Sequence, residues 1–209
     1  GLLHHGVEQN QHIARPVGQP EPPQHRLARR RLAGGDVGPA GCADPPHPPQ
    51  PLPSCRFSGP SEFQQLLRDA FETAAREGWK EMVLCDADFI DWPLGERAVF
   101  ESLNAWATGG GRLTLLARRY GALRQGHARF VPRRTRCSHL IEARGCPPAD
   151  PLDLPSVLWS PGWMLHRVDP VRSQGVTSAE AERRVVLRET LNEWLRQSSP
   201  AFPATTLGL

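Results

Sequence analysis

The sequence predicts an α/β fold, a single sandwich in which helices flank a central, mostly parallel sheet. Three observations support this prediction. Apolar residues recur at helical spacing over 61–77 and 96–107, and short apolar runs at 80–85 and 113–117 have the length of buried strands. Helical and strand-like segments also alternate along the chain. A helix inserted between two strands favours parallel pairing of those strands.

The first helix is indicated by a capping box at its N-terminus, an apolar face and a glycine at its C-terminus. Ser61-Glu62-Phe63-Gln64 has the S-x-x-Q form of a capping box. Gly78 is well placed to end the helix. The apolar face consists of Phe63, Leu66, Leu67, Ala70, Phe71 and Ala74.

The middle of the chain predicts a second helix between two buried strands. After the strand at 80–85 we expect a turn at 91–95, a helix over 96–107 ended by the glycines at 109–111, and a strand at 113–117. A short helix at 120–128 and a third strand at 138–142 follow. The buried side of the 96–107 helix is expected to comprise Leu94, Ala98, Val99, Leu103, Trp106 and Ala107.

The C-terminal third predicts a strand pair and a closing helix. Segments 156–159 and 163–168 read as strands joined by a turn at Pro161-Gly162. Thr177-Ser178-Ala179-Glu180 resembles a second capping box, so we expect the last helix to begin near Thr177 or Ser178 and to run to about Gln197. It should bury Leu187, Leu191, Trp194 and Leu195. Residues 198–209 should pack on the 56–197 domain without regular structure.

Residues 1–55 differ from the rest in composition. They contain half of the prolines and no aromatic residue. With so little apolar surface and so many prolines, this Pro/His/Arg-rich tail is predicted to be disordered. Because the segment begins with Gly1 and is dominated by residues typical of GC-rich DNA read in another frame, we also hypothesise that it is not native coding sequence.

Charge and cysteine content narrow the class of protein. The net charge of +3 provides no strong field for nucleic acid, and Lys80 is the single lysine. No apolar run approaches the roughly 20 residues that span a bilayer, and no signal-peptide pattern opens the chain. The five cysteines form no CxxC pair and no paired framework. We therefore expect a cytoplasmic protein with no membrane association.

An acidic edge at the end of the 80–85 strand is the first candidate site. Asp86, Asp88 and Asp91 follow the strand directly, and ligands of α/β sheets bind at the carboxyl ends of strands. The stretch 83–88 is similar to the DxD motif of haloacid-dehalogenase-like phosphatases. That resemblance implies Asp86 as nucleophile and Asp88 as general acid/base, with Mg²⁺ bound by both. The downstream lysine of that family is absent, and the alternative is that the three carboxylates cap the following turn.

His139 is the second candidate. In its order of elements and in Ser138-His139-Leu140-Ile141-Glu142, the segment 58–197 resembles half of a phospholipase-D-like domain of the H-x-K superfamily. The resemblance implies a phospholipase-D-like fold with His139 as nucleophile. Ile141 occupies the position of the lysine, so we expect a degenerate site in which His139 and Glu142 are the remaining catalytic candidates. Arg133, Arg134 or Arg144 could replace the lysine in space. The alternative is a structural histidine.

A second resemblance covers residues 56–209. The stretches DADFIDWPLGERAV, RLTLLARRY, SHLIEAR and LPSVLWSPGW are similar to an uncharacterised bacterial domain related to the same superfamily. Such domains occur beside acetyltransferase domains. The resemblance therefore implies a regulatory role with a protein partner of the acetyltransferase type.

Two further groups of residues are candidates for ligand binding. Trp92, Trp159 and Trp163 could form a stacking platform for a ligand, but tryptophan more often fills a core. Arginines concentrate over 118–136, where Arg133 and Arg134 are ligand-binding candidates, yet no interleaved aromatic set indicates base recognition.

The sequence thus predicts a non-catalytic binding or regulatory domain without a cofactor. A protein partner or a homodimer is expected, and nucleic acid is not. The alternative is a phosphoryl-transfer enzyme or phosphodiester hydrolase that uses Asp86 and Asp88 with a divalent metal, or His139 across a dimer.

Overall fold

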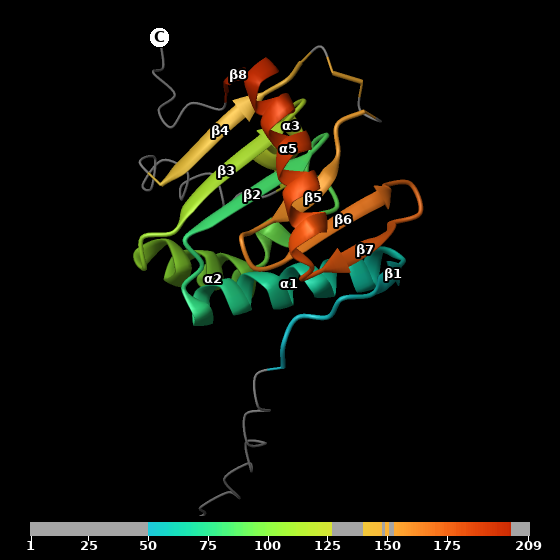
Figure 1. Ribbon diagram of the computed structural model, residues 1–209. Coiled ribbons are helices and arrows are strands. Elements are labelled where there is room, and N and C mark those ends of the chain that lie inside the picture. Colours follow the sequence, from blue (N-terminus) through green and yellow to red (C-terminus); the bar gives the residue numbers. More distant parts are fainter. Residues whose placement is uncertain (1–49, 127–139, 148, 151–152, 202–209) are drawn as a thin grey trace, which may run out of the picture. The chain divides into compact units, whose positions relative to one another are not determined.

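The computed structural model describes residues 50–126, 140–147, 149–150 and 153–201 (Figure 1). The chain divides into Gly1–Pro46 and His47–Leu209, and all described residues belong to the second unit. The predicted disorder of residues 1–55 therefore falls mostly outside the described part.

An eight-stranded sheet forms the centre of the domain, in the order β1-β7-β6-β5-β2-β3-β4-β8 (Figure 1). Only β2 with β3 and β3 with β4 pair in parallel; the other five pairings are antiparallel. The strands are β1 (Arg56–Ser58), β2 (Glu81–Asp86), β3 (Arg112–Ala117), β4 (Ile141–Gly145), β5 (Ser156–Trp159), β6 (Met164–Asp169), β7 (Gln174–Ser178) and β8 (Ser199–Pro200).

The predicted fold class is therefore wrong. The domain is not a phospholipase-D-like sandwich with a mostly parallel sheet, but a mixed sheet in which antiparallel pairs predominate. The reason lies in the connections. The links from β5 to β6 and from β6 to β7 are only four residues long, and a parallel pair needs a crossover of a dozen residues or more.

Helices cover the two faces of the sheet unequally. α1 (Pro60–Glu77) and α2 (Arg97–Thr108) lie side by side on one face, whereas α5 (Ala181–Gln197) packs on the other (Figure 1). Alternate residues of β2 show the division. Met82 and Leu84 belong to the core beneath α1 and α2, and Val83 and Cys85 belong to the core that includes Leu187 and Leu191 of α5.

Helix α1 confirms the predicted apolar face, all six members of which are buried. Gly78 ends the helix in the left-handed conformation at φ 64°, as expected. The predicted capping box is wrong, because Gly59 is the N-cap and Pro60 the first helical residue. The Glu62 carboxylate instead accepts a hydrogen bond from the Ser58 amide at 2.9 Å.

Most of the other predicted elements have the predicted type, and three differ from the prediction in position or type. β2, α2, β3 and the β5–β6 hairpin lie within a residue or two of their predicted bounds, with a 3₁₀ turn at Pro93–Gly95 and a short α3 at Gly121–Gly126. β4 begins at Ile141, later than expected. The segment expected to open the last helix is β7, and α5 begins only at Ala181. Ser199 and Pro200, expected to be irregular, pair with β4.

Candidate functional site

Asp86 ends β2 as a buried carboxylate, 3% exposed, at the predicted acidic edge. Its Oδ1 accepts hydrogen bonds from the backbone amides of Asp88 and Phe89 at 3.2 and 3.0 Å. Its Oδ2 accepts from Trp92 Nε1 at 3.0 Å and from Ser156 Oγ at 2.5 Å. Protein donors therefore occupy both oxygens.

Arg167 of β6 supplies the charge that balances Asp86. Its Nη2 lies 2.9 Å from Asp86 Oδ2, its Nη1 lies 3.2 Å from Asp91 Oδ2, and its Nε donates to Ser156 Oγ at 3.0 Å. The guanidinium also lies 4.2 Å from the ring centre of Phe63. A buried pair of this kind is tolerated only when the remaining hydrogen-bonding groups are satisfied, and here they are.

The structure thus brings Asp86 and Asp91 together through Arg167 rather than through an open metal site. Asp88 Oδ1 accepts a hydrogen bond from the Ile90 amide at 3.0 Å, as a turn-capping aspartate does. Among the described residues, no group of three or more His, Cys, Asp or Glu side chains has an arrangement that could hold a metal ion. Mg²⁺ binding at Asp86 and Asp88 stays a prediction.

The predicted histidine site lies largely outside the described residues, which include neither His139 nor Arg133 and Arg134. Ile141, at the position of the H-x-K lysine, is buried in the core beneath α1 and α2. Glu142 points to the opposite face and is exposed. A side chain at 141 therefore faces the core, away from the face on which Glu142 lies.

The three candidate tryptophans are core residues, as the alternative interpretation predicted. Trp92, Trp159 and Trp163 are 2%, 8% and 2% exposed. Trp159 Nε1 donates to the Arg184 carbonyl at 2.8 Å, and Trp163 Nε1 donates to the Pro53 carbonyl at 2.9 Å. Buried and hydrogen-bonded, they do not form an open stacking platform.

The free thiols on the α5 side are also buried. Burial raises the pKa of the Cys85 thiol well above its usual value, and the neighbouring Asp86 adds to the increase. Burial likewise raises the pKa of Cys146, although Arg144 opposes this shift. Both thiols are therefore protonated near neutral pH and are poor nucleophiles.

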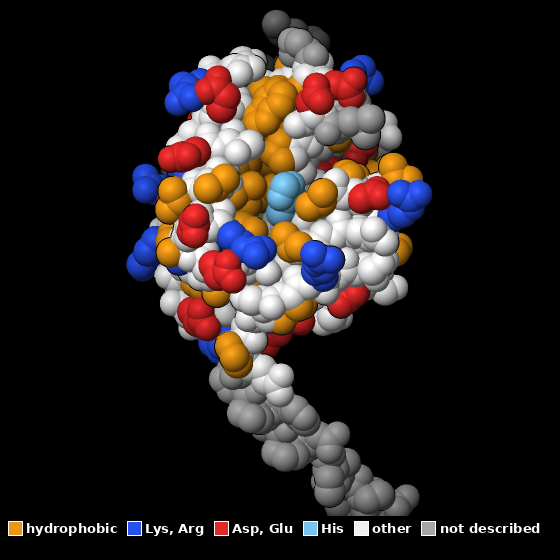
Figure 2. Space-filling view, turned by 45° about the vertical axis from the view of Figure 1, so that its right-hand side comes forward, with side chains coloured by type: hydrophobic (Ala, Val, Ile, Leu, Met, Phe, Trp, Pro, Cys, Tyr) orange, Lys and Arg blue, Asp and Glu red, His pale blue; other side chains and the backbone are white. Residues whose placement is uncertain are grey.

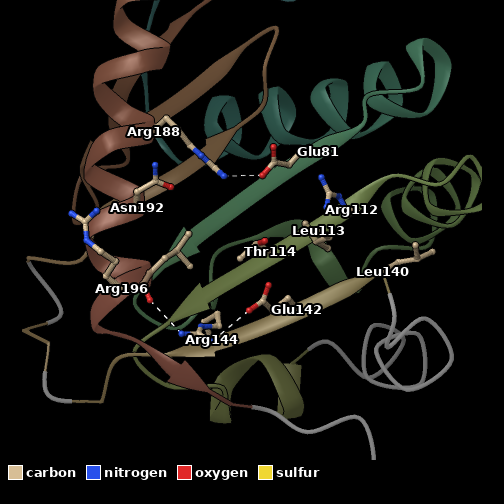
Figure 3. A pocket seen from close by; sticks show the side chains of 11 residues that line it. Glu81, Arg112, Leu113, Thr114, Leu140, Glu142, Arg144, Arg188, Asn192 and Arg196 are labelled. Carbon is tan, nitrogen blue, oxygen red and sulfur yellow. Dashed lines mark hydrogen bonds and ion pairs between the residues drawn. The ribbon is translucent and has the colours of Figure 1, made fainter.

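A polar cleft of about 840 Å³ lies on the α5 face, between this helix and strands β2, β3 and β4 (Figure 3). We call it the arginine cleft. Its polar side chains are Glu81, Arg112, Thr114, Glu142, Arg144, Arg188, Asn192 and Arg196.

Strand register explains why these side chains meet. Thr114 lies opposite Glu142 across the parallel β3–β4 pair, and Glu81 lies opposite Arg112 across β2–β3. Since alternate residues of a strand face the same side, the polar positions of three strands form one floor. Arg188, Asn192 and Arg196, spaced by four residues, form the wall on α5 (Figure 3).

The lining of the cleft has a net positive charge, because it contains four arginines and two glutamates. Arg188 Nη2 lies 2.9 Å from Glu81 Oε1, and Arg144 Nη1 lies 3.5 Å from Glu142 Oε1. Arg144 is fixed further by hydrogen bonds to Ser198 Oγ at 2.9 Å and to the Ser198 carbonyl at 2.7 Å. The guanidinium of Arg144 is therefore held in place before any ligand arrives.

Two guanidinium groups retain unused donors. Arg188 Nη1 is buried and has no hydrogen-bond partner, while its Cζ lies 4.6 Å from the ring centre of Trp159. The exposed Arg112 side chain makes no hydrogen bond or ion pair with any other residue that the structure describes. An unsatisfied buried donor costs about 1–3 kcal/mol, so an acceptor reaching Arg188 would recover that energy.

Most of this cleft was not predicted from the sequence. Glu142 and Arg144 were candidates for a site, but Arg112, Thr114 and the polar residues of α5 were not. The available signal was the polar alternation of Arg112 and Thr114 in a strand otherwise apolar.

Comparison with known proteins supports the fold but assigns no family. No protein-family model matches the chain, and no curated protein matches it. Among solved structures it is similar to TrmBL2, an archaeal chromatin protein that binds DNA, with a TM-score of 0.55 and 14% identity. The match covers 73% of this chain and 55% of TrmBL2, so the chain spans about half the length of that protein.

At this identity the likeness to TrmBL2 shows the fold alone. Because the fold occurs in a DNA-binding protein, it does not support our prediction that nucleic acid is not a partner. Within the described residues, no helix combines the length and the apolar character needed to cross a bilayer.

Proposed function

We propose that this domain is a non-catalytic, cytoplasmic binding module, and that the arginine cleft holds a small anionic ligand carrying carboxylate or phosphate groups. The observation that carries the proposal is the cleft itself, in which arginines from β3, β4 and α5 converge and two retain unused donors. Guanidinium groups bind carboxylate and phosphate through paired hydrogen bonds.

A binding role fits the chemistry of the cleft better than a catalytic one. Its described polar lining consists of arginine, glutamate, threonine and asparagine side chains. Both glutamates are ion-paired, and no pair of nucleophile and base is assembled from the lining residues. The cleft can therefore hold and orient an anion.

A regulatory consequence follows from the position of the ligand. An anion between Arg112 and Arg188 would connect β3 to α5, and binding energy would then stabilise the packing of α5 on the sheet. The acetyltransferase-type partner predicted from the sequence is one candidate for a protein that would bind differently when the packing of α5 is stabilised.

The test is a thermal-unfolding titration of the full chain with inorganic phosphate and, separately, with succinate, against sodium chloride at equal ionic strength. A ligand at a hundredfold excess over its Kd stabilises the folded state by about 2.7 kcal/mol. We expect one of the two probes to raise Tm in the wild type and not in Arg112→Ala.

Arg119→Ala is the matched control, because Arg119 is an exposed arginine outside the cleft. An increase in Tm that survives in Arg112→Ala, or is lost equally in Arg119→Ala, would show that the cleft is not the binding site. The same holds if neither probe raises Tm above the salt control.

A further inference from the structure

The strands that form the floor of the arginine cleft arrange its polar side chains in three levels. The first level contains Glu81 of β2 and Arg112 of β3, which are opposite one another in the strand register. Two residues further along, Thr114 of β3 lies opposite Glu142 of β4. Arg144, two residues further along β4, forms the third level. Since each strand residue rises about 3.3 Å, consecutive levels lie about 6.6 Å apart.

Helix α5 repeats the same three levels on the wall of the cleft. Its polar lining residues follow one another at steps of four, about 6 Å of helix, and are Arg188, Asn192 and Arg196. The first lies beside Glu81, with which it pairs at 2.9 Å. The last lies near Arg144, which donates to the Leu195 carbonyl at 3.3 Å. The helix and the strands therefore run in the same direction with nearly equal steps (Figure 3).

The arginines occupy the two outer levels, and the middle level contains none of them. The outer pairs are Arg112 with Arg188, and Arg144 with Arg196. In the middle level, the Glu142 carboxylate is 63% exposed and would repel an anion placed beside it. The two positive ends are separated by about 13 Å of strand, so the cleft has two separate positions for anionic groups.

The donors at both ends are available to a ligand. The exposed Arg112 guanidinium has no partner among the described residues, as noted above. Arg196 is 69% exposed and pairs with Glu193 of its own helix. Since an exposed ion pair contributes little to stability, Arg196 can turn to a ligand at little cost.

The other flank of α5 is unsuited to an anion. The groove of about 550 Å³ between α5 and β6 contains one arginine, Arg183, and two glutamates, Glu180 and Glu182, in its lining. Figure 2 shows hydrophobic side chains gathered around a histidine in a hollow of this face. Within the described surface on either side of α5, the arginine cleft is therefore the side that attracts an anion.

We infer that the ligand of the arginine cleft is a small molecule with an anionic group at each end and hydroxyl groups between them, as in a sugar bisphosphate. This inference rests on the function proposed above. One anionic group binds at the level of Arg112 and the other at the level of Arg196. Because arginine side chains are long, they can also hold groups that lie closer together than the two levels.

The middle level explains the hydroxyl groups. Thr114 and Asn192 can both donate and accept hydrogen bonds, and the Glu142 carboxylate accepts them. A nucleic-acid strand fits this level poorly, because it carries a phosphate at every nucleotide. One of these phosphates would lie beside Glu142.

The test is isothermal titration calorimetry of the full chain with two matched pairs of probes. Fructose 1,6-bisphosphate is compared with fructose 6-phosphate, and galactarate with gluconate, so the members of a pair differ by one terminal anionic group. In one of the pairs, the doubly charged member should bind about tenfold more tightly or better. The pair that shows this difference identifies the terminal groups as phosphate or carboxylate.

Two controls separate the spacing of the charges from their number. Inorganic pyrophosphate and malonate carry two anionic groups close together, and they should bind no more tightly than the singly charged probes. Arg112→Ala and Arg196→Ala each remove one end of the site and should abolish the difference within the pair. Arg119→Ala, at an exposed arginine outside the cleft, should preserve it.

Equal affinities within both pairs overturn the inference. So does tight binding of pyrophosphate or malonate, or a difference that persists in Arg112→Ala and Arg196→Ala. In each of these cases, an Arg112-dependent increase in Tm with phosphate or succinate would still support the proposed function. If that increase is also absent, both the inference and the proposed function fail.

Discussion

Asp86 and Arg167 are the residues whose removal the domain should tolerate least. Their side chains are 4% and 3% exposed, and they form the 2.9 Å ion pair at the end of β2. Removing one partner of a buried pair leaves the other charge without compensation, at a cost of about 3–5 kcal/mol. We expect Asp86→Asn to lower the free energy of unfolding by about 3 kcal/mol in urea denaturation.

Asp88→Asn is the control for that measurement. Asp88 is only half-buried, and an asparagine oxygen can still accept the Ile90 amide, so the expected loss is below about 1 kcal/mol. Equal losses in the two variants would contradict the buried-pair account.

The same proteins also test the metal-dependent prediction. A Tm that rises with Mg²⁺ in the wild type and not in Asp88→Asn would support it, whereas the five donors around Asp86 lead us to expect no increase.

His166 should make stability depend on pH. Burial lowers the pKa of His166 below its usual value of about 6.5. His166 lines a groove between β6 and α5, together with Glu180, Glu182 and Arg183. The unfolded chain therefore binds a proton at a higher pH than the folded chain, and stability falls as pH decreases below about 6.5.

Urea unfolding at pH 7.5 and 5.5 would measure this effect. We expect the wild type to lose more stability than His166→Gln between the two pH values. A loss of the same size in both proteins would show that other groups carry the pH dependence.

Among the elements, β7 depends on a residue without a side chain. A Cβ at Gly175 would lie 2.2 Å from the His166 carbonyl oxygen and 2.5 Å from Phe57 Cζ. Neither neighbour can move freely, since one belongs to β6 and the other to the core beneath α1. Gly175→Ala should therefore destabilise the domain by about 1–3 kcal/mol.

Gly162→Ala provides the comparison for β7, because no atom lies within 4 Å of its added Cβ. It should change the urea midpoint little. If Gly175→Ala were equally mild, the close packing of β1, β7 and β6 would have to be looser than the structure shows.

β7 is also the element that the sequence analysis assigned wrongly, and its partners explain why. Thr177 resembles a helix cap locally, but its amide donates to the Cys55 carbonyl at 2.8 Å and its hydroxyl to the Pro53 carbonyl at 2.7 Å. These partners are more than 120 residues away in the sequence. A local capping signal cannot include them, and tertiary pairing overrides it. The apolar face of α1, by contrast, depends on local spacing alone and was predicted in full.

At the scale of the whole molecule, the sheet is wider than its cover on one face. Strands lie about 4.8 Å apart and a helix is about 10–12 Å across, so one helix covers two or three of eight strands. α5 covers the centre, which leaves the polar arginine cleft on one side and, on the other, a groove of about 550 Å³ lined by Met164, His166, Val186 and Leu187 among others.

The same arrangement explains which part of the site the sequence could predict. Asp86, Asp88 and Asp91 lie within six residues of one another in the chain, so their proximity was evident. Arg167, the partner of Asp86 and Asp91, comes from an antiparallel strand that the pairing rules did not place. The cleft residues come from three strands and a distant helix. No spacing in the sequence connects Arg112 with Arg188, and only the pairing order of the sheet does.

Arg167 joins a carboxylate 81 residues earlier in the chain and stacks on Phe63 of α1. The pair connects the antiparallel half of the sheet, which holds β6, to the parallel half, which holds β2. If β5, β6 and β7 detached while the rest stayed folded, Asp86 would remain as an unbalanced charge beside the core. That intermediate has a high free energy, so the two halves should unfold in one cooperative transition. Because the pair joins residues 81 positions apart in the chain, its formation should make folding slow.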